Sequence, residues 1–140
     1  MYLIDTNVIS EIRKGKKADL GVQDFFKNIV SNDLPAYISA ITVGELRRGI
    51  EQLHHRNDNK QATMLEVWLS GLLKEYENNI LVFDSEVAQV WGFLRVPHYE
   101  HVLDKQIAAT ALVNNLIVVT RNVEDFVSSG VELLNPFTQH

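Results

Sequence analysis

The sequence has 140 residues, of which 46% are hydrophobic and 22% charged, values that are typical of folded globular proteins and exclude an intrinsically disordered chain. It contains no cysteine, which excludes disulfides, thiolate catalysis and cysteine-bound zinc. The net charge of −5 argues against a protein that grips nucleic acid over a broad basic face, so we expect any such contact to be local.

Neither a membrane nor an exported location is expected. Residues 1–5 contain no basic leader, and the uncharged residues 106–120 are interrupted by two asparagines. That run falls short of the ~20 apolar residues that a membrane-spanning helix needs. We therefore expect a cytoplasmic protein. The length fits one domain, and without a repeat or linker we predict a single domain over residues 1–140.

The N-terminal half alternates short apolar runs with helical patterns of apolar residues. The predicted elements are, in order, a strand at residues 2–4, a helix through 8–12 that stops near Gly15, a helix at 25–30, a strand at 36–39, a helix at 43–53 and an amphipathic helix at 64–73. The polar residues 54–60 indicate a connection between the last two helices. The helix at 43–53 therefore directly follows a strand.

The C-terminal half continues the same alternation. The predicted elements are a strand at 80–83, a helix through 87–94 that Asp84 or Ser85 caps and Pro97 ends, a helix that begins at Asp104, a strand at 116–120 and a short strand at 131–134. Residues 116–120 are apolar and rich in β-branched side chains, as in a strand buried on both faces of a parallel sheet. We predict an α/β fold with three α/β/α layers around a mostly parallel sheet.

Three acids follow predicted strands or begin predicted helices. In open α/β sheets, ligands bind outside the carboxyl ends of the strands. Asp5 directly follows the first strand, where an N-cap or turn role is an equally good interpretation. Glu45 follows the second strand, but Thr42 to Glu45 also fits a capping box, which is the better interpretation of that residue alone. Asp104 begins a helix, where capping is the default explanation.

A fourth polar segment follows the buried strand and runs from Thr120 to Asp125. Interpretations of single residues do not explain why four segments bring an acid or amide to one edge of the sheet. Carboxylates grouped in this way repel one another unless a cation is present. An oxygen-rich site without cysteine suits Mg²⁺ or Mn²⁺, and such an ion supports phosphodiester hydrolysis.

Other chemical motifs are missing or weak. The sequence lacks a phosphate-binding P-loop, a dinucleotide-binding glycine motif, the H-E-x-x-H zinc motif and the G-x-S-x-G nucleophile motif. His98 and His101 have a spacing that allows chelation, but they lie in a predicted loop after Pro97, so we expect no metal there. The basic runs at residues 13–17 and 47–48 are of a kind that is usually solvated surface.

Four segments of the sequence together resemble PIN-domain toxins of the VapC and FitB type. They are IDTNVISE at residues 4–11, SAITVGEL at 39–46, DKQIAATA at 104–111, and TRN at 120–122 with the following Asp125-Phe126. The likeness extends over nearly the whole chain. It implies a PIN-like fold and a metal-dependent endoribonuclease, the toxin component of a type II toxin-antitoxin system, with Mg²⁺ or Mn²⁺ as cofactor. It also implies a homodimer and a cognate antitoxin whose C-terminal segment fills the active-site groove, with DNA contacted only through the antitoxin.

The resemblance also implies roles for individual residues. Asp5, Glu45 and Asp104 match the acids that hold the metal, and some relatives carry aspartate where this chain has Asn122. We expect Asp125 to be the fourth acid, with Asn122 in support. Direct metal binding is assigned to Asp5 and Asp104, while Glu45 and Asp125 complete the site or orient the attacking water. The expected polar support comes from Thr6, Asn7 and Thr120.

Two other interpretations stay open. One is a catalytically silent PIN-fold protein that acts as a binding module in a regulatory complex. The other is an aspartyl-phosphate enzyme or receiver, which by resemblance would carry a second aspartate where this chain has Asn7. For RNA contact, we expect a salt-sensitive groove edge that involves Arg47, Arg48 or Arg121.

Overall fold

The computed structural model describes residues 1–138. Its elements, in chain order, are β1 (Tyr2–Ile4), α1 (Thr6–Ile12), the 3-10 helix η1 (Gly15–Lys17), α2 (Leu20–Ser31), β2 (Ala36–Ser39), α3 (Ala40–His55), α4 (Asn59–Glu75), β3 (Ile80–Leu81), α5 (Ser85–Leu94), α6 (Val102–Asn114), β4 (Ile117–Val119), α7 (Val123–Phe126), the 3-10 helix η2 (Val127–Ser129) and β5 (Leu133–Leu134). The predicted alternation of strands and helices is confirmed. None of the helices in this range has the length and apolar character needed to cross a membrane.

The five strands form one sheet in the order β3-β2-β1-β4-β5, and every pairing is parallel. The central strand β1 pairs with β2 on one side, where Tyr2 faces Ala36, and with β4 on the other, where Ile4 faces Val119. The chain builds outward from β1 through β2 to β3 and then returns to β4 on the opposite side. This reversal of strand order opens a crevice at the carboxyl ends of β1 and β4.

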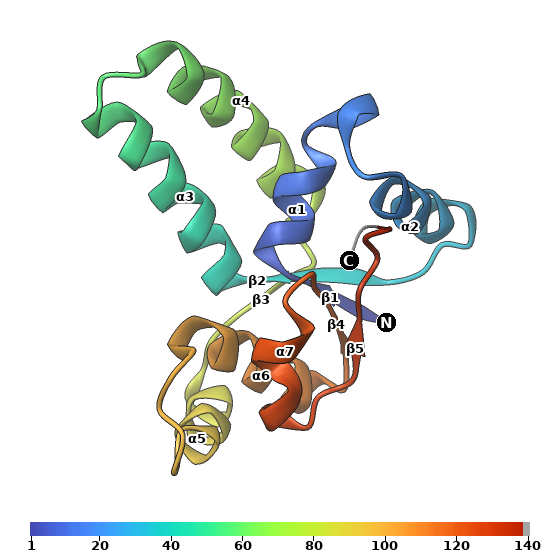
Figure 1. The fold of residues 1–140 in the computed structure, drawn as a ribbon, viewed down its shortest axis with the longest axis vertical. Helices are drawn as coiled ribbons and strands as arrows, with labels where there is room; N and C mark the ends of the chain where they lie inside the picture. The colour runs from blue at the N-terminus through green and yellow to red at the C-terminus, as the bar shows by residue number, and fades with distance from the viewer. Residues whose placement is uncertain (139–140) are drawn as a thin grey trace.

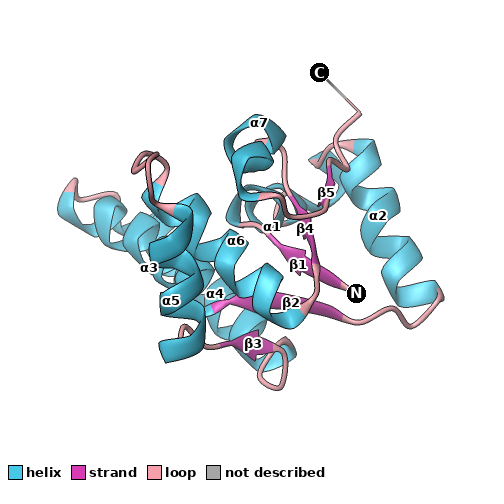
Figure 2. Cartoon of the chain, turned by 90° about the horizontal axis from the view of Figure 1, so that it is seen from below, coloured by secondary structure: helices cyan, strands magenta, loops and turns pink. Residues whose placement is uncertain are grey.

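Helices cover both faces of the sheet, which confirms the predicted three layers (Figures 1 and 2). Alternate residues of β1 and β4 point to opposite faces. Ile4 and Val119 pack with α1 to α4 in one core, whereas Leu3 and Val118 pack with α6 and α7 in the other. These four side chains are fully buried. As expected for a strand covered on both sides, the sequence of β4 is uniformly apolar.

Both edge strands are shorter than the sequence-based expectation. The strand predicted at 80–83 ends at Leu81, because β3 lies at the sheet edge and Val82 is 64% exposed. The strand predicted at 131–134 contains only Leu133 and Leu134.

The helices α3 and α4 pack against each other as a hairpin that extends beyond the sheet (Figure 1). The link between them spans residues 56–58, within the predicted connection.

Candidate active site

Asp5 lies at the carboxyl end of the central strand, where β1 turns into α1. Its Oδ1 accepts the backbone N–H of Thr6 at 2.8 Å, and its Oδ2 accepts the hydroxyl of Thr120 at 2.8 Å. Only 3% of the residue is exposed. Burial raises the pKa of Asp5, while the hydrogen bonds from Thr120 and Thr6 act in the opposite direction and Glu45 raises it further. The residue is the helix N-cap, as one interpretation predicted, and its second oxygen binds Thr120, which directly follows β4.

Asn7 and Thr120 join the segments that follow β1 and β4. The Asn7 amide nitrogen donates to Asp5 Oδ2 at 3.3 Å, and its oxygen accepts the backbone N–H of Arg121 at 3.1 Å. Thr120 is fully buried, and its hydroxyl also accepts the N–H of Asn122 at 3.0 Å. All three expected supporting residues therefore contact Asp5: Asn7 and Thr120 through their side chains, and Thr6 through its backbone N–H.

Glu45 reaches the same edge from α3, and the capping box expected at Thr42 to Glu45 is wrong. The helix begins three residues earlier, with Ser39 as its N-cap, and the Ser39 hydroxyl accepts the N–H of Ile41 at 3.0 Å. Glu45 therefore lies in the second turn. Its Oε1 accepts a hydrogen bond from the Thr6 hydroxyl at 2.7 Å. The carboxylate therefore binds a residue at the sheet edge and does not cap its own helix.

Asp104 approaches from the opposite layer, in the first turn of α6. The helix expected to begin at Asp104 begins at Val102, with His101 as its N-cap in the left-handed conformation (φ 57°). The Asp104 side chain is 24% exposed. Burial, together with the charges of Asp5 and Asp125, raises its pKa to about 6. Asp104 therefore lies within the electrostatic field of the other acids.

Asp125 completes the set from α7, and its side chain is 36% exposed. His101 lies between the last two acids: its Nδ1 is 3.9 Å from Asp104 Oδ2, and its Nε2 is 3.8 Å from Asp125 Oδ1. His98, in contrast, lies 3.7 Å from Glu100 on an exposed loop. The two histidines do not form a chelating pair. Sequence reasoning missed His101 as a site residue; the available signal was its position three residues before Asp104.

The arginines expected to contact RNA have different surroundings. Arg47 binds Glu66 through both terminal nitrogens, at 2.6 and 3.0 Å, and also contacts Glu51 at 3.2 Å. The guanidinium of Arg121 lies over the ring of Phe137, 4.7 Å from its centre. Arg48 is exposed and forms no ion pair within residues 1–138. The charge of Arg47 is therefore already compensated by protein groups.

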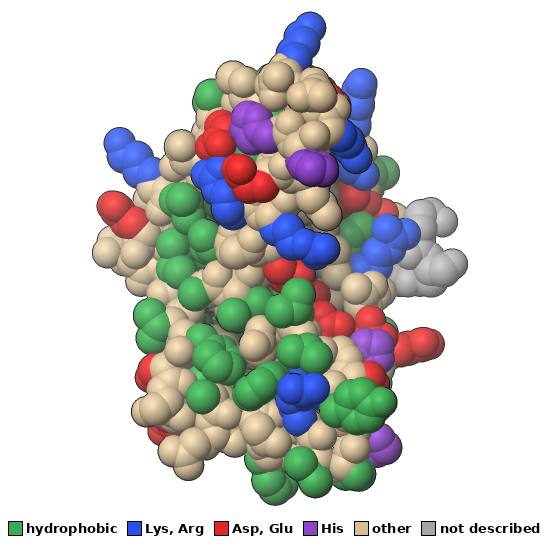
Figure 3. All heavy atoms as spheres, turned by 90° about the vertical axis from the view of Figure 1, so that its left-hand side faces the viewer, with side chains coloured by type: hydrophobic (Ala, Val, Ile, Leu, Met, Phe, Trp, Pro, Cys, Tyr) green, Lys and Arg blue, Asp and Glu red, His purple; other side chains and the backbone are tan. Residues whose placement is uncertain are grey.

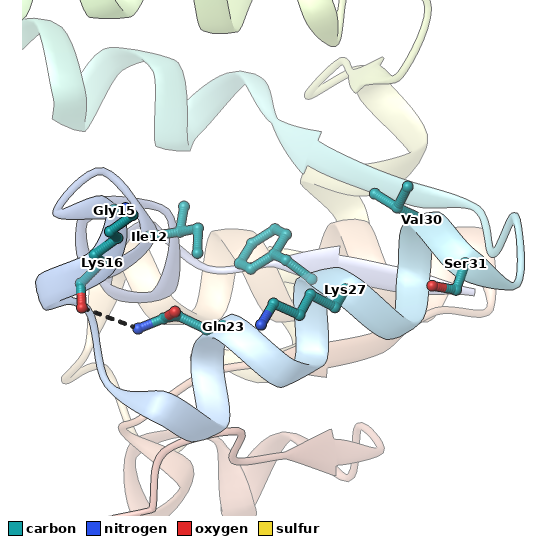
Figure 4. Close-up of a pocket in the computed structure, with 8 residues that line it drawn as sticks. Ile12, Gly15, Lys16, Gln23, Lys27, Val30 and Ser31 are labelled. Atoms are coloured by element: carbon teal, nitrogen blue, oxygen red, sulfur yellow. Dashed lines mark hydrogen bonds between the residues drawn. The ribbon is translucent and has the colours of Figure 1, made fainter.

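One hollow adjoins Glu45, and another lies apart from all four acids. A hollow of about 250 Å³ between α1, α3 and α4 is lined by the polar residues Thr6 and Glu45 and by apolar residues that include Leu46, Ile50 and Trp68. A second hollow, of about 570 Å³, lies between η1 and α2 and is lined by none of the acids. Figure 4 shows this second hollow, where Gln23 donates a hydrogen bond to the carbonyl of Lys16. Of these two hollows, only the first is lined by one of the four acids, Glu45.

The donor set fits a hard divalent cation. Carboxylates from α3, α6, α7 and the end of β1 share one edge. The surroundings of Asp104 raise its pKa and so disfavour its charged form. In the part of the chain that the structure describes, no lysine or arginine forms an ion pair with any of these four acids. A cation would relieve this repulsion, and oxygen ligands are those that Mg²⁺ and Mn²⁺ prefer.

Comparison with known proteins gives a consistent result. Residues 2–127 match the sequence profile of the PIN domain family. Toxin FitB from Neisseria gonorrhoeae is 34% identical over 98% of this chain and 99% of its own. VapC ribonuclease Y4jK from Sinorhizobium fredii is 31% identical over 98% of each chain. The crystal structure of FitAcB from Neisseria gonorrhoeae superposes with a TM-score of 0.84 at 33% identity, covering 99% of this chain and 100% of that one.

Proposed function

Since the chain belongs to the PIN domain family, as a toxin of the VapC and FitB type, we propose that it is a metal-dependent endoribonuclease. The observation that carries this proposal is the convergence of four acids, without a lysine or arginine partner among residues 1–138, at the switch point of a parallel sheet. One of the relatives is named a ribonuclease. RNA phosphodiester bonds are thus the proposed substrate.

Asp5 and Asp104 would hold Mg²⁺ or Mn²⁺, and Glu45 and Asp125 would complete the site. When bound, the ion supplies an acidified water and stabilises charge on the phosphodiester. Asp5 is fixed in orientation by Thr120 and Asn7, which leaves it no freedom to turn away from the edge. We assign Asn122 a supporting role, because its backbone N–H donates to the Thr120 hydroxyl.

Glu45 is the proposed acceptor of the proton from the attacking water. The Thr6 hydroxyl binds one of its oxygens, and Thr42 Oγ1 lies 3.1 Å from that hydroxyl. This chain of polar contacts sets the orientation of the Glu45 carboxylate, and an oriented carboxylate near a reacting water acts as a general base. Arg48 and Arg121 are the proposed RNA contacts, because Arg47 is engaged by Glu66.

A cognate antitoxin is the proposed inhibitor, and its C-terminal segment would occupy the hollow beside Glu45. That hollow combines apolar walls with the polar groups of Thr6, Arg13 and Glu45, which suits a peptide with apolar anchors and a basic or polar end. A net charge of −5 disfavours direct DNA binding, so DNA would be contacted through the antitoxin. The pair would meet in the cytoplasm, where RNA is available.

A homodimer and a single domain over residues 1–140 complete the proposal. Large apolar side chains lie exposed on α5 and the loop after it, among them Phe93 (80%), Val96 (77%) and Tyr99 (72%). Figure 3 shows hydrophobic side chains gathered over this lower part of the molecule. Exposed apolar patches commonly mark protein interfaces. Sedimentation of the isolated protein as a monomer would contradict the dimer.

The nuclease proposal is tested by incubating purified, partner-free protein with a pool of small RNAs. We expect discrete cuts with Mn²⁺ or Mg²⁺ and none with EDTA. Circular dichroism confirms that the protein is folded in both conditions. Absence of cutting by folded, metal-supplied protein would overturn the proposal and favour the catalytically silent binding module.

A further inference from the structure

Among residues 1–138, His101 is the one imidazole that faces two of the proposed site acids. Its two ring nitrogens point to different carboxylates, Asp104 from α6 and Asp125 from α7, at 3.9 and 3.8 Å. One donor atom from each of the three residues lies within 4.8 Å of the other two. Both contacts are too long for direct hydrogen bonds.

The spacing of the three side chains is close to that of ligands around a common ion. Bonds of about 2.1 Å around an octahedral ion place adjacent ligand atoms about 3 Å apart and opposite ones about 4.2 Å apart. An imidazole binds an ion through one ring nitrogen, and the distances of 3.9 and 3.8 Å start from different nitrogens, so they do not describe one ligand set. The relevant observation is that one donor atom from each of the three residues lies within 4.8 Å of the other two. Side-chain rotation that brings these three atoms closer together would let them bind one ion.

The fold holds His101 in place from both sides. Its carbonyl accepts the N–H of Lys105 at 2.9 Å and so begins α6. The Lys105 side chain, only 1% exposed, donates to the carbonyl of His98. Arg95 donates to the carbonyl of Tyr99 at 2.9 Å. Hydrogen bonds to two of its carbonyls thus hold the loop before His101 in place. Ligands that surrounding hydrogen bonds fix in this way bind metal with better-defined geometry.

We propose that His101 is a nitrogen ligand of the catalytic metal site, together with Asp104 and Asp125, and that it makes the site prefer Mn²⁺ to Mg²⁺. Mg²⁺ favours oxygen ligands and retains its waters. Mn²⁺ accepts imidazole more readily, as a first-row transition metal. The inference rests on the proposed function, because it adds a ligand to the acidic site described above.

The test measures binding of Mn²⁺ and of Mg²⁺ to the full chain by titration calorimetry, for wild type, His101→Asn, His98→Asn and Asp5→Asn. Asparagine is chosen because it tolerates the left-handed backbone of residue 101 and caps helices well. His98→Asn is the matched control in the same exposed loop. Thermal melting verifies that each variant folds.

For His101→Asn we expect Mn²⁺ affinity to fall by about 10-fold or more, with a much smaller change for Mg²⁺. His98→Asn should bind both ions as wild type does. Pulsed electron paramagnetic resonance of the Mn²⁺-loaded protein should show coupling to an imidazole nitrogen that His101→Asn abolishes and His98→Asn retains.

The two proposals fail in different ways. If Asp5→Asn weakens ion binding but His101→Asn binds both ions as wild type does, without loss of a nitrogen coupling, the acidic site stands and the role of His101 is overturned. If the wild type binds neither ion, or if Asp5→Asn leaves binding unchanged, the acidic site itself is wrong, and the assignment of His101 is overturned with it.

Discussion

Two regions of this molecule bring a histidine and two carboxylates within metal-binding distance of one another. One is the sheet edge with His101, Asp104 and Asp125; the other is the α3–α4 cluster, which consists of Glu51, His54 and Glu66. By ligand type and spacing they are alike. They differ in what compensates their negative charge. In the α3–α4 cluster, the Arg47 guanidinium binds both carboxylates, whereas the sheet edge has no such partner among the described residues.

The pKa values of the two regions move in opposite directions. Hydrogen bonds from Arg47 lower the pKa of Glu66 below its ordinary value. Burial and neighbouring acids raise the pKa of Asp104 to about 6. An acid that is kept ionised by a built-in cation has a structural role. An acid that is buried against other acids is poised to bind an external cation, and such perturbed groups mark functional sites.

The largest expected effect is on RNA cleavage, with Asp5→Asn compared with Glu66→Gln. Asp5→Asn keeps the shape of the side chain but removes the charge proposed to hold the metal, so the cleavage rate should fall by more than about 100-fold. Glu66→Gln should cleave at the wild-type rate. Rates are measured on one labelled RNA at saturating Mn²⁺. An Asp5→Asn protein that retains the wild-type rate would remove Asp5 from the mechanism.

Metal binding should stabilise the protein only through the sheet edge. Mn²⁺ at about 100 to 1,000 times its dissociation constant should raise the free energy of unfolding by about 3 to 4 kcal/mol. Added EDTA should reverse the gain. The stabilisation should persist in Glu51→Gln, where only the α3–α4 cluster is altered, and should largely vanish in Asp104→Asn. Equal stabilisation of these two variants in thermal melts would place the bound ion elsewhere.

Without metal, Asp104 should make the protein less stable as the pH rises. Its pKa is raised from 3.8 to about 6 on folding, so between these values the folded state binds more protons than the unfolded state. The contribution of Asp104 to the free energy of unfolding is therefore greatest below pH 3.8 and is lost as the pH rises through 6.

In EDTA at about pH 7.5, Asp104→Asn should be more stable than wild type by about 1 to 2 kcal/mol. Urea unfolding at about pH 7.5 and about pH 5 measures this difference, which should shrink at the lower pH. A difference that does not change with pH would mean that ionisation of Asp104 is not its cause.

Much of the fold and the location of the acids could be predicted from the sequence. The apolar runs at 2–4, 36–39 and 116–120 identify central strands because each is buried on both faces. Carboxyl ends of parallel strands meet at one edge, so Asp5 and the segment from Thr120 to Asp125 come together even when element boundaries are uncertain by a residue or two. The predicted edge strands are longer than the observed ones, because an apolar residue such as Val82 can lie exposed at a sheet edge.

The remaining features depend on contacts that local patterns do not encode. The choice between Ser39 and Thr42 as helix N-cap is decided by where β2 ends, and only the earlier start turns Glu45 toward Thr6. The approach of His101 to the acids depends on a left-handed residue and on the fastening of its loop by Lys105. Whether residues 1–140 form a single domain stays a prediction.

The smallest expected effect concerns Arg47 and sharpens the contrast between the two regions. Because its ion pairs with Glu51 and Glu66 are exposed, Arg47→Gln should lower the melting temperature only slightly, and about 1 M salt should abolish the difference. RNA affinity should be unchanged, since the guanidinium is already bound by glutamates. Arg48→Gln is the matched control with the reverse expectation: an unchanged melting temperature and weaker RNA binding that depends less steeply on salt. If Arg47→Gln weakens RNA binding as much as Arg48→Gln does, Arg47 must leave Glu66 for the RNA, and the α3–α4 cluster would then hold an RNA-binding arginine in the absence of RNA.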